Sequence, residues 1–595
     1  MAASKAEEMG GGETPAVPLQ GRRDLETDPD AKGSRGDIMS SPAAVTDLDL
    51  RDVELNALDT EKQPMNASSP PAGSPGSLGE KNGVVMVKLD EEEEEEEEEE
   101  RGALAKFTGL SKEELLEVAS TPAWVRTRWA LLILFWLGWL GMLAGAIVII
   151  VQAPRCKDLP KQTWWQKGGI YRIRNLDGFQ DSNADGRGDL AGLKQRMDYI
   201  SSLKVKGLVI GPLHLNPRDD QNGTDLQKVD PVFGSLDEFR EILQAAKKKS
   251  LKVVLDLTPN YQSEYPWFNQ SIHLNVALQD KMKDAIEFWL KEGVSGIQLG
   301  SVEELQDAQI LRDWKNLTEQ YNEDDHGRSS DRARERKDPQ GIFALLNETD
   351  GADVLTSEYL AGMVKDPEEA TRGNVAESLI SNYIQEAGDK WSGWSVARLN
   401  VGEAASPMGE PLLRLYHMLL YTLPGTPFTD YGDEIGLRDL PGKPAASSVT
   451  RMQWDSSANY GFSKEPQPPS SLAETNVTVE QQSGDQDSVL TFFKQLSELR
   501  GKERSLLHGE YSTAQSGSPS VFSYLRVWDQ NKRFLVVLNF APREITVSID
   551  HPDLPADMAV ELSTDPGREK QQQLALGSLT LGPSEGLMLS FVYVA

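Results

Sequence analysis

Four polar residues lie in one short segment at a spacing that suits a bound cation. Asp181, Asn183 and Asp185 alternate along the chain before a glycine, and Asp189 follows them. Oxygen ligands at alternate positions around a tight turn are typical of calcium loops. The segment differs from an EF-hand because Gly192 occupies the twelfth position, where an EF-hand has a glutamate. Two interpretations stay open: a calcium site, or a polar turn that binds no metal.

The chain contains a single cysteine, Cys156, so it cannot form an internal disulfide. This cysteine lies five residues after a long apolar segment that ends at Val151. An odd cysteine on the oxidising side of a membrane favours a disulfide with another chain, and a free or capped thiol is the alternative. We therefore predict an interchain disulfide at Cys156.

The apolar segment, residues 130–151, is long enough for a membrane-spanning helix. Trp124 and Trp129 flank it as interfacial anchors, while Gly141 and Gly145 leave a small-residue face suited to close contact with another helix. The N-terminus shows no basic stretch and short apolar run of the kind that marks a cleaved signal peptide. We predict one uncleaved span that serves as a signal anchor.

Five asparagines that follow the apolar segment stand in the acceptor pattern for N-glycosylation: Asn222, Asn269, Asn316, Asn347 and Asn476. Glycosylation requires the extracellular side of the membrane. The sequence therefore predicts a type II plasma-membrane glycoprotein with a cytoplasmic N-terminus, an extracellular C-terminus and a short extracellular neck at residues 152–164.

The part before the span is acidic and of low complexity. Residues 1–105 are rich in Gly, Pro, Ser, Asp and Glu and end in the acidic run 90–100, which predicts a disordered cytoplasmic tail. In residues 106–129, Ser111 and Glu114 have the spacing of a capping box, so we expect a short juxtamembrane helix. Acidic residues outnumber basic ones by 93 to 61 over the whole chain, which excludes nucleic acid as a partner.

After the neck, short strand-like runs alternate with amphipathic helical stretches over residues 165–504. The strand-like runs are 169–173, 207–213, 252–257, 296–299 and 342–346. Such alternation predicts an α/β fold with parallel βα units, and this many repeats suit a (β/α)₈ TIM barrel. Residues 322–340 are charged and show no apolar period, so we expect a long surface loop there. Residues 505–595 change to short alternating strands, which predict an antiparallel β-sandwich domain.

Three motifs in the barrel region carry a family resemblance. They are Asp181-Ser-Asn-Ala-Asp-Gly-Arg-Gly-Asp189, Asp256-Leu-Thr-Pro-Asn260, and Leu423-Pro-Gly-Thr-Pro427 followed by Tyr431-Gly-Asp-Glu-Ile-Gly436. In this order they resemble the α-amylase and α-glucosidase family. The whole chain is similar to the heavy subunits of heteromeric amino-acid transporters in solute carrier family three. In the resembling glucosidases, the loop that matches Asp181, Asn183, Asp185 and Asp189 binds calcium.

The residues that catalyse glycoside hydrolysis in that family are missing at the matching positions. The family needs two carboxylates beside the scissile bond. Its nucleophile follows strand four in a Gly-Phe-Arg-X-Asp pattern, whereas this chain reads Gly296-Ile-Gln-Leu-Gly300, and Tyr261 replaces the family's histidine. The His-Asp pair near strand seven is absent from residues 391–395. Glu348 or Glu358 could supply an acid, but an acid without a nucleophile cannot form the glycosyl intermediate.

The resemblance implies a catalytically inactive heavy subunit that requires no cofactor. Its partner would be a multi-span light chain that exchanges amino acids, joined through Cys156 and the transmembrane helix, stabilised by this subunit and delivered to the plasma membrane. A single span cannot form an alternating-access path by itself, so any transport belongs to the partner. Two other function classes stay open: a cell-surface adhesion or signalling receptor with its own partners, and a membrane-anchored glucosidase.

Overall fold

The computed structural model describes residues 111–152, 157–262, 272, 275–300, 308–321, 329–334, 352–357, 360, 371–396, 403–440, 449–464 and 477–592. Several predicted features lie outside these residues: the tail 1–105, the strand-like run 342–346, Cys156, Asn269, Asn347, Asn476, Glu348 and Glu358.

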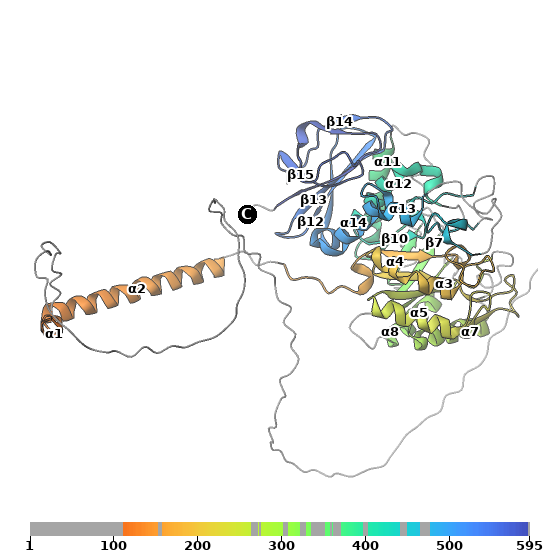
Figure 1. The fold of residues 1–595 in the computed structure, drawn as a ribbon, viewed down its shortest axis with the longest axis horizontal. Helices are drawn as coiled ribbons and strands as arrows, with labels where there is room; N and C mark the ends of the chain where they lie inside the picture. The colour runs from red at the N-terminus through yellow and green to blue at the C-terminus, as the bar shows by residue number, and fades with distance from the viewer. Residues whose placement is uncertain are drawn as a thin grey trace, which may run out of the picture. The chain divides into compact units, whose positions relative to one another are not determined.

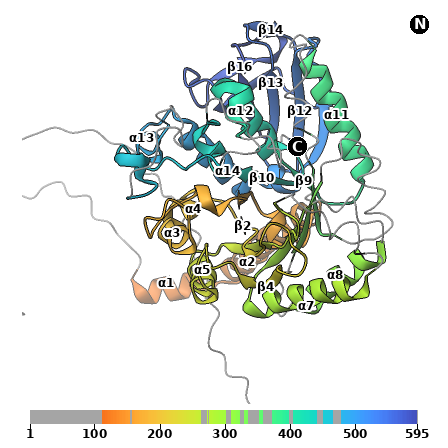
Figure 2. The same cartoon turned by 90° about the vertical axis from the view of Figure 1, so that its right-hand side faces the viewer.

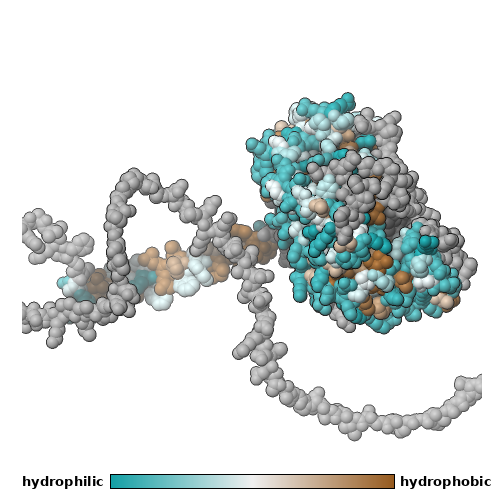
Figure 3. All heavy atoms as spheres, turned by 45° about the vertical axis from the view of Figure 1, so that its right-hand side comes forward, coloured by the Kyte–Doolittle hydropathy of each residue, from teal (hydrophilic) through white to brown (hydrophobic). Residues whose placement is uncertain are grey.

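Two helices precede the globular part. In α1 (Lys112–Ala119), Ser111 Oγ accepts a hydrogen bond from Glu114 N, and the Ser111 backbone N–H donates to the Glu114 carboxylate, which is the expected capping box. Helix α2 (Pro122–Gln152) is apolar all round and about 46 Å long at 1.5 Å per residue. Among the described residues it is the only helix long and apolar enough to cross a membrane. Figure 3 shows its apolar side chains in brown.

Eight parallel strands close into a barrel, in the order β1-β10-β9-β8-β7-β6-β5-β2. The strands are β1 (Ile170–Ile173), β2 (Gly207–Ile210), β5 (Lys252–Asp256), β6 (Gly296–Leu299), β7 (Ser329–Arg334), β8 (Val354–Ser357), β9 (Ser392–Trp394) and β10 (Thr426–Asp430). A short hairpin of β3 (His214–Leu215) and β4 (Asp225–Val229) follows β2. The (β/α)₈ TIM barrel predicted from the alternating pattern is confirmed.

The predicted surface loop at residues 322–340 is wrong for its central part. Strand β7 lies there and pairs with β6 on one side and β8 on the other. Its sequence, Ser-Ser-Asp-Arg-Ala-Arg, has no apolar run and therefore gives no strand signal. Strand formation here follows from backbone pairing on both edges, which closes the barrel and overrides the weak local propensity.

The helices that surround the barrel follow their sequence signals closely. Helix α5 begins at a capping box of Ser235 and Glu238, and α7 ends at Gly293, which has a φ of +102°. Figure 2 shows α7 and α8 side by side. The set comprises α3 (Leu190–Gln195), α4 (Met197–Ser202), α5 (Leu236–Lys248), α7 (Val276–Glu292), α8 (Ala308–Gln320), α11 (Arg372–Ala387) and α12 (Ala405–Thr422).

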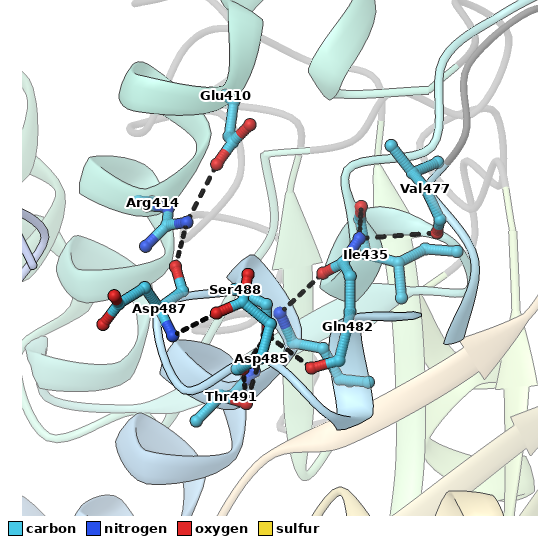
Figure 4. Close-up of polar contacts among 10 residues, drawn as sticks. Glu410, Arg414, Ile435, Val477, Gln482, Asp485, Asp487, Ser488 and Thr491 are labelled. Carbon is cyan, nitrogen blue, oxygen red and sulfur yellow. Dashed lines mark hydrogen bonds and ion pairs between the residues drawn. The ribbon is translucent and has the colours of Figure 1, made fainter. Parts of the chain in front are cut away.

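Three further helices lead from the barrel into the C-terminal domain: α13 (Val479–Ser483), α14 (Val489–Lys502) and α15 (Arg504–His508). Polar contacts fix their junction, as Figure 4 shows. Gln482 of α13 donates to the carbonyl of Ile435 at 2.7 Å and accepts from Leu490 N at 3.0 Å. Arg414 of α12 donates to Glu410 at 2.8 Å and to the Asp487 carbonyl at 2.6 Å. These bonds hold the start of α14 against α12 and the end of β10.

The C-terminal domain is antiparallel, as predicted (Figure 1). One sheet has the order β11-β12-β13-β18-β15-β16, and a second sheet pairs β14 with β17. The strands are β11 (Glu510–Ala514), β12 (Val521–Val527), β13 (Arg533–Asn539), β14 (Ile545–Val547), β15 (Asp557–Ser563), β16 (Gln573–Ala575), β17 (Leu579–Leu581) and β18 (Gly586–Phe591).

Strand β13 shows why the larger sheet is buried on both faces. Phe534, Val536 and Leu538 belong to the same apolar cluster as the barrel and its helices. The alternate residues Leu535 and Val537 belong to a second cluster with β14 and β17. Because successive side chains of a strand point to opposite faces, one continuous apolar run covers both. The sheet therefore packs between the barrel helices and the smaller sheet.

Two fully buried arginines lie where α12 meets this sheet. Arg526 of β12 donates to three backbone carbonyls, those of Thr422 (2.6 Å), Leu506 (3.0 Å) and Gly509 (2.9 Å). Arg500 of α14 donates to the carbonyls of Leu423 (2.7 Å), Leu506 (2.6 Å) and Gly425. The last carbonyls of a helix have no partner within it and form the negative end of its dipole, so a cation is favoured there. Burial lowers the pKa of Arg500 to about 9 and that of Arg526 to about 10.

We expect Arg526→Met to lower the free energy of unfolding by about 3 kcal/mol, because methionine fills similar space but removes the donors to the carbonyls of Thr422 and Gly509 and one of the two donors to the carbonyl of Leu506. Urea denaturation of the purified protein measures the change. The control is Arg543→Met, which removes an exposed arginine of the same domain. Equal stability of the two variants would show that Arg526 does not join the barrel to the sheet.

Candidate functional site

The carboxyl ends of the barrel strands are the place where TIM-barrel enzymes carry their active sites. Three side chains meet there at the ends of β5 and β6. Gln298 Nε2 donates to Asp256 Oδ2 at 2.7 Å, and the Thr258 backbone N–H donates to Asp256 Oδ1 at 2.9 Å. Burial raises the pKa of Asp256, while these hydrogen bonds act in the opposite direction. The motif comparison predicts Gln298 at the position of the family's arginine, which would place an amide where the family has a cation.

A charged cluster fills the neighbouring part of this end. Arg172 of β1 donates to Asp430 Oδ1 at 2.7 Å and to Ser395 Oγ at 2.6 Å. Arg174 pairs with the other oxygen of the same carboxylate. Arg172 and Asp430 are almost completely buried. The carboxylate of Asp430 is therefore paired with the guanidinium groups of Arg172 and Arg174.

Gly300, which the motif comparison predicts at the position of the family's nucleophile, has little room for a side chain. Gly300 N donates to Thr258 Oγ1 at 2.7 Å. A Cβ atom added to Gly300 would lie 2.9 Å from that hydroxyl oxygen. Tyr261, at the family's histidine position, packs edge-on against His214 with ring centroids 5.3 Å apart. Burial raises the pKa of Tyr261 to about 12 and keeps its hydroxyl neutral.

An acidic cluster that was not predicted from the sequence lies after β10. Glu434 accepts hydrogen bonds from the hydroxyls of Tyr171 (2.7 Å) and Tyr199 (2.6 Å), and its neighbour Asp433 accepts from Ala404 N at 3.3 Å. Burial, with the charges of Asp430 and Glu434, raises the pKa of Asp433 to about 8. The motif 431–436 contains both carboxylates, Asp433 and Glu434. The two tyrosines come from distant segments of the chain, so only the fold brings their hydroxyls to Glu434.

The candidate calcium loop makes a dense set of internal hydrogen bonds. Asp181 accepts from Ala184 N and Gly186 N, both at 2.7 Å, and Asn183 Oδ1 accepts from Asp185 N at 3.0 Å. Asp189 caps α3 by accepting from Gly192 N at 2.7 Å, and it also accepts from Ser182 N at 2.9 Å. Within the described part of the chain, no three Asp, Glu, His or Cys side chains are grouped to hold a metal ion. These bonds fit both interpretations, because each carboxylate oxygen that accepts a backbone N–H still has a second lone pair.

Two of the five candidate glycosylation sites lie within the described residues. Asn222 is exposed in the turn between β3 and β4, and Asn316 is exposed on α8. The hydroxyls of their partners Thr224 and Thr318 are buried and donate to backbone carbonyls at 2.7 Å. Both asparagine side chains are therefore accessible to a glycan.

A cavity of about 510 Å³ opens between α14 and β15. Its wall mixes cations such as Lys502 and Arg568 with anions such as Glu498 and Asp565. Ligand pockets are mostly apolar with a few convergent polar groups, so this lining is typical of a solvent-filled gap between domains.

Comparison with known proteins agrees with this architecture. The family described as "Solute carrier family 3 member 2 N-terminus" matches residues 92–171, and the α-amylase catalytic domain matches residues 176–275 and 397–509. Among solved structures, the trehalose-6-phosphate hydrolase of Bacillus licheniformis has a TM-score of 0.60 at 17% identity, covering 73% of this chain and 100% of its own. The chain therefore belongs to the class of proteins that carry an α-amylase-type barrel, here preceded by one apolar helix.

The sequence relatives narrow this class. The amino acid transporter heavy chain SLC3A2 of Oryctolagus cuniculus is 48% identical, over 92% of this chain and 99% of its own length. The human amino acid transporter heavy chain SLC3A1 is 28% identical, over 81% of this chain and 85% of its own. This chain belongs to the amino acid transporter heavy chains of solute carrier family 3, in agreement with the resemblance seen in the sequence.

We expect the stability of the protein to depend on pH through Asp433. Its pKa is higher in the folded state than the ordinary value near 4, so the folded protein holds this proton more tightly and loses stability as the pH rises from about 4 to 8. Asp433→Asn removes this charge, so it should raise the melting temperature at pH 8 and have a smaller effect at pH 5. Asp553→Asn, at an exposed position, serves as the control. Parallel pH profiles for wild type and Asp433→Asn would contradict the assignment.

Calcium binding at Asp181, Asn183, Asp185 and Asp189 stays a prediction of the sequence, and thermal unfolding tests it. A bound ion would raise the melting temperature in proportion to ln(1 + [Ca²⁺]/Kd). If the ion binds, the melting temperature is higher in millimolar calcium than in chelator, and Asp185→Asn should abolish the difference. Identical melting curves in calcium and in chelator would leave only the polar-turn interpretation.

Proposed function

We propose that this chain is the non-catalytic heavy subunit of a heteromeric amino-acid transporter. The close packing of Gly300 against Thr258 supports the absence of catalysis, because the resembling glucosidases have their nucleophile at this position. The relatives, named as amino acid transporter heavy chains, support the subunit role. Transport itself would belong to a multi-span light chain, because a single apolar helix cannot enclose a substrate path.

The membrane arrangement follows from the same proposal. Helix α2 crosses the plasma membrane as a type II signal anchor, with the N-terminus in the cytoplasm and the barrel and C-terminal domain outside as the ectodomain. The exposed acceptor sites Asn222 and Asn316 are consistent with this side. Cys156 forms a disulfide with the light chain, and the heavy chain stabilises that partner and brings it to the cell surface.

Catalysis is tested on the purified protein. We expect no hydrolysis of maltose or p-nitrophenyl glucoside above background, because glycine offers no nucleophile. Gly300→Asp should remain inactive, since its Cβ would lie 2.9 Å from Thr258 Oγ1 and Gln298 replaces the arginine that the family places beside the nucleophile. Hydrolysis that survives purification and is lost on substitution of Glu348 or Glu358 would show a glucosidase.

The partner is tested by purifying the intact protein from cells whose thiols are blocked before lysis. We expect a band above the monomer mass on a non-reducing gel, and Cys156→Ser should remove it. Much of the complex should persist in mild detergent, because the disulfide only adds effective concentration to an existing contact.

A wild-type chain that runs at its monomer mass would exclude the covalent link. Co-purification with other surface proteins but no multi-span partner would favour the receptor alternative over the transporter subunit.

A further inference from the structure

The first described residue after the membrane helix is held against the C-terminal domain. The backbone N–H of Lys157 donates to Asp529 Oδ2 at 3.0 Å, and its Nζ donates to Glu510 Oε1 at 3.1 Å. The same ammonium group lies 5.8 Å from the centre of the Trp528 ring, whose other neighbour is His508 at a ring distance of 5.2 Å. We call Lys157, Glu510, Trp528 and Asp529 the neck clamp.

The clamp lies at one end of the large sheet. Glu510 starts β11 and pairs with Val527, the last residue of β12. Arg533 at the start of β13 pairs with Phe591 at the end of β18, so these residues share the same end. Loop residues such as Glu544, between β13 and β14, lie beyond the opposite end, about 20 Å away along the seven residues of β13.

Chain length limits how far the clamp can lie from the membrane helix. Helix α2 ends at Gln152, and only four residues separate it from Lys157. Five chain steps span at most about 18 Å, even when the chain is fully extended. The clamp end of the sheet must therefore lie close to the membrane surface at which α2 emerges, whereas the opposite end can lie much farther away.

The ion pair alone would not set an orientation, because both side chains are more than half exposed and surface ion pairs contribute little. Here it acts together with a backbone hydrogen bond and a cation–π contact at one residue. Lys157 is already close to the sheet because it belongs to the same chain. The three contacts therefore need only to fix the direction in which the neck leaves the C-terminal domain.

We propose that Lys157 is a positioning residue, which fixes the ectodomain with the clamp end of its sheet toward the membrane and thus toward the extracellular surface of the light chain. This inference rests on the proposed function for the membrane and the partner. The interaction surface that it defines is the end of the sheet formed by the starts of β11 and β13 and the ends of β12 and β18.

The orientation is measured by energy transfer in the full chain. The chain has one cysteine, so Cys156→Ser provides a background for single labels. Asn531→Cys places a donor at the clamp end, and Glu544→Cys places one at the opposite end. In nanodiscs with acceptor-labelled lipid headgroups, transfer should be several-fold stronger from position 531. Equal transfer, or stronger transfer from position 544, would overturn the proposal.

The role of the clamp is tested by charge reversal in the same background. Lys157→Glu should weaken and broaden the transfer from position 531, and the double variant Lys157→Glu with Glu510→Lys should restore it. Lys161→Glu, in the same neck segment, is the matched control. A Lys157→Glu signal identical to that of the control would remove the positioning role. Because no light chain is needed in the nanodisc, failure here is distinguishable from failure of the transporter proposal.

Discussion

The burial of two guanidinium groups against the end of α12 is the interaction on which the globular part depends. Burying a charge is costly unless its donors are satisfied. Arg500 and Arg526 place their donors on carbonyls at and beyond the end of α12, on backbone groups that a helix leaves unpaired. Because these arginines come from α14 and β12, the bonds of their terminal nitrogens also join the barrel to the sheet, while the buried Nε of each makes no hydrogen bond. The main apolar cluster accordingly contains residues from both domains.

Because the two domains share a core, a contact that constrains the C-terminal domain also constrains the barrel. Lys157 touches only the C-terminal domain, at Glu510, Trp528 and Asp529. A flexible joint between the domains would confine any orienting effect to the sheet. With α12 packed against β10 on one side and against β13 and β18 on the other, a constraint on the sheet also directs the barrel. Under the proposed membrane arrangement, the contacts of Lys157 would therefore position the barrel together with the C-terminal domain.

The parts of the fold that could be predicted from the sequence are those with strong local signals. Residues 252–257 were predicted as a strand from their strand-like run, and they contain β5. Strand β7 was missed because its stability comes from two neighbouring strands rather than from its own polar sequence. The cluster around Glu434 was missed because Tyr171 and Tyr199 approach it only in the folded barrel. Local patterns indicate elements, whereas polar clusters depend on tertiary contacts.

The proposed loss of catalysis agrees with the internal pairing of polar groups at the carboxyl end of the barrel. An active site must keep charged groups unsatisfied or strained until substrate arrives, and this lowers stability. Here Asp430 is shared by two arginines, and Asp256 accepts from Gln298 and Thr258. These contacts pair polar groups with one another inside the barrel. Under the proposed function the barrel is an extracellular body beside a partner, and no reaction requires these groups to stay unpaired.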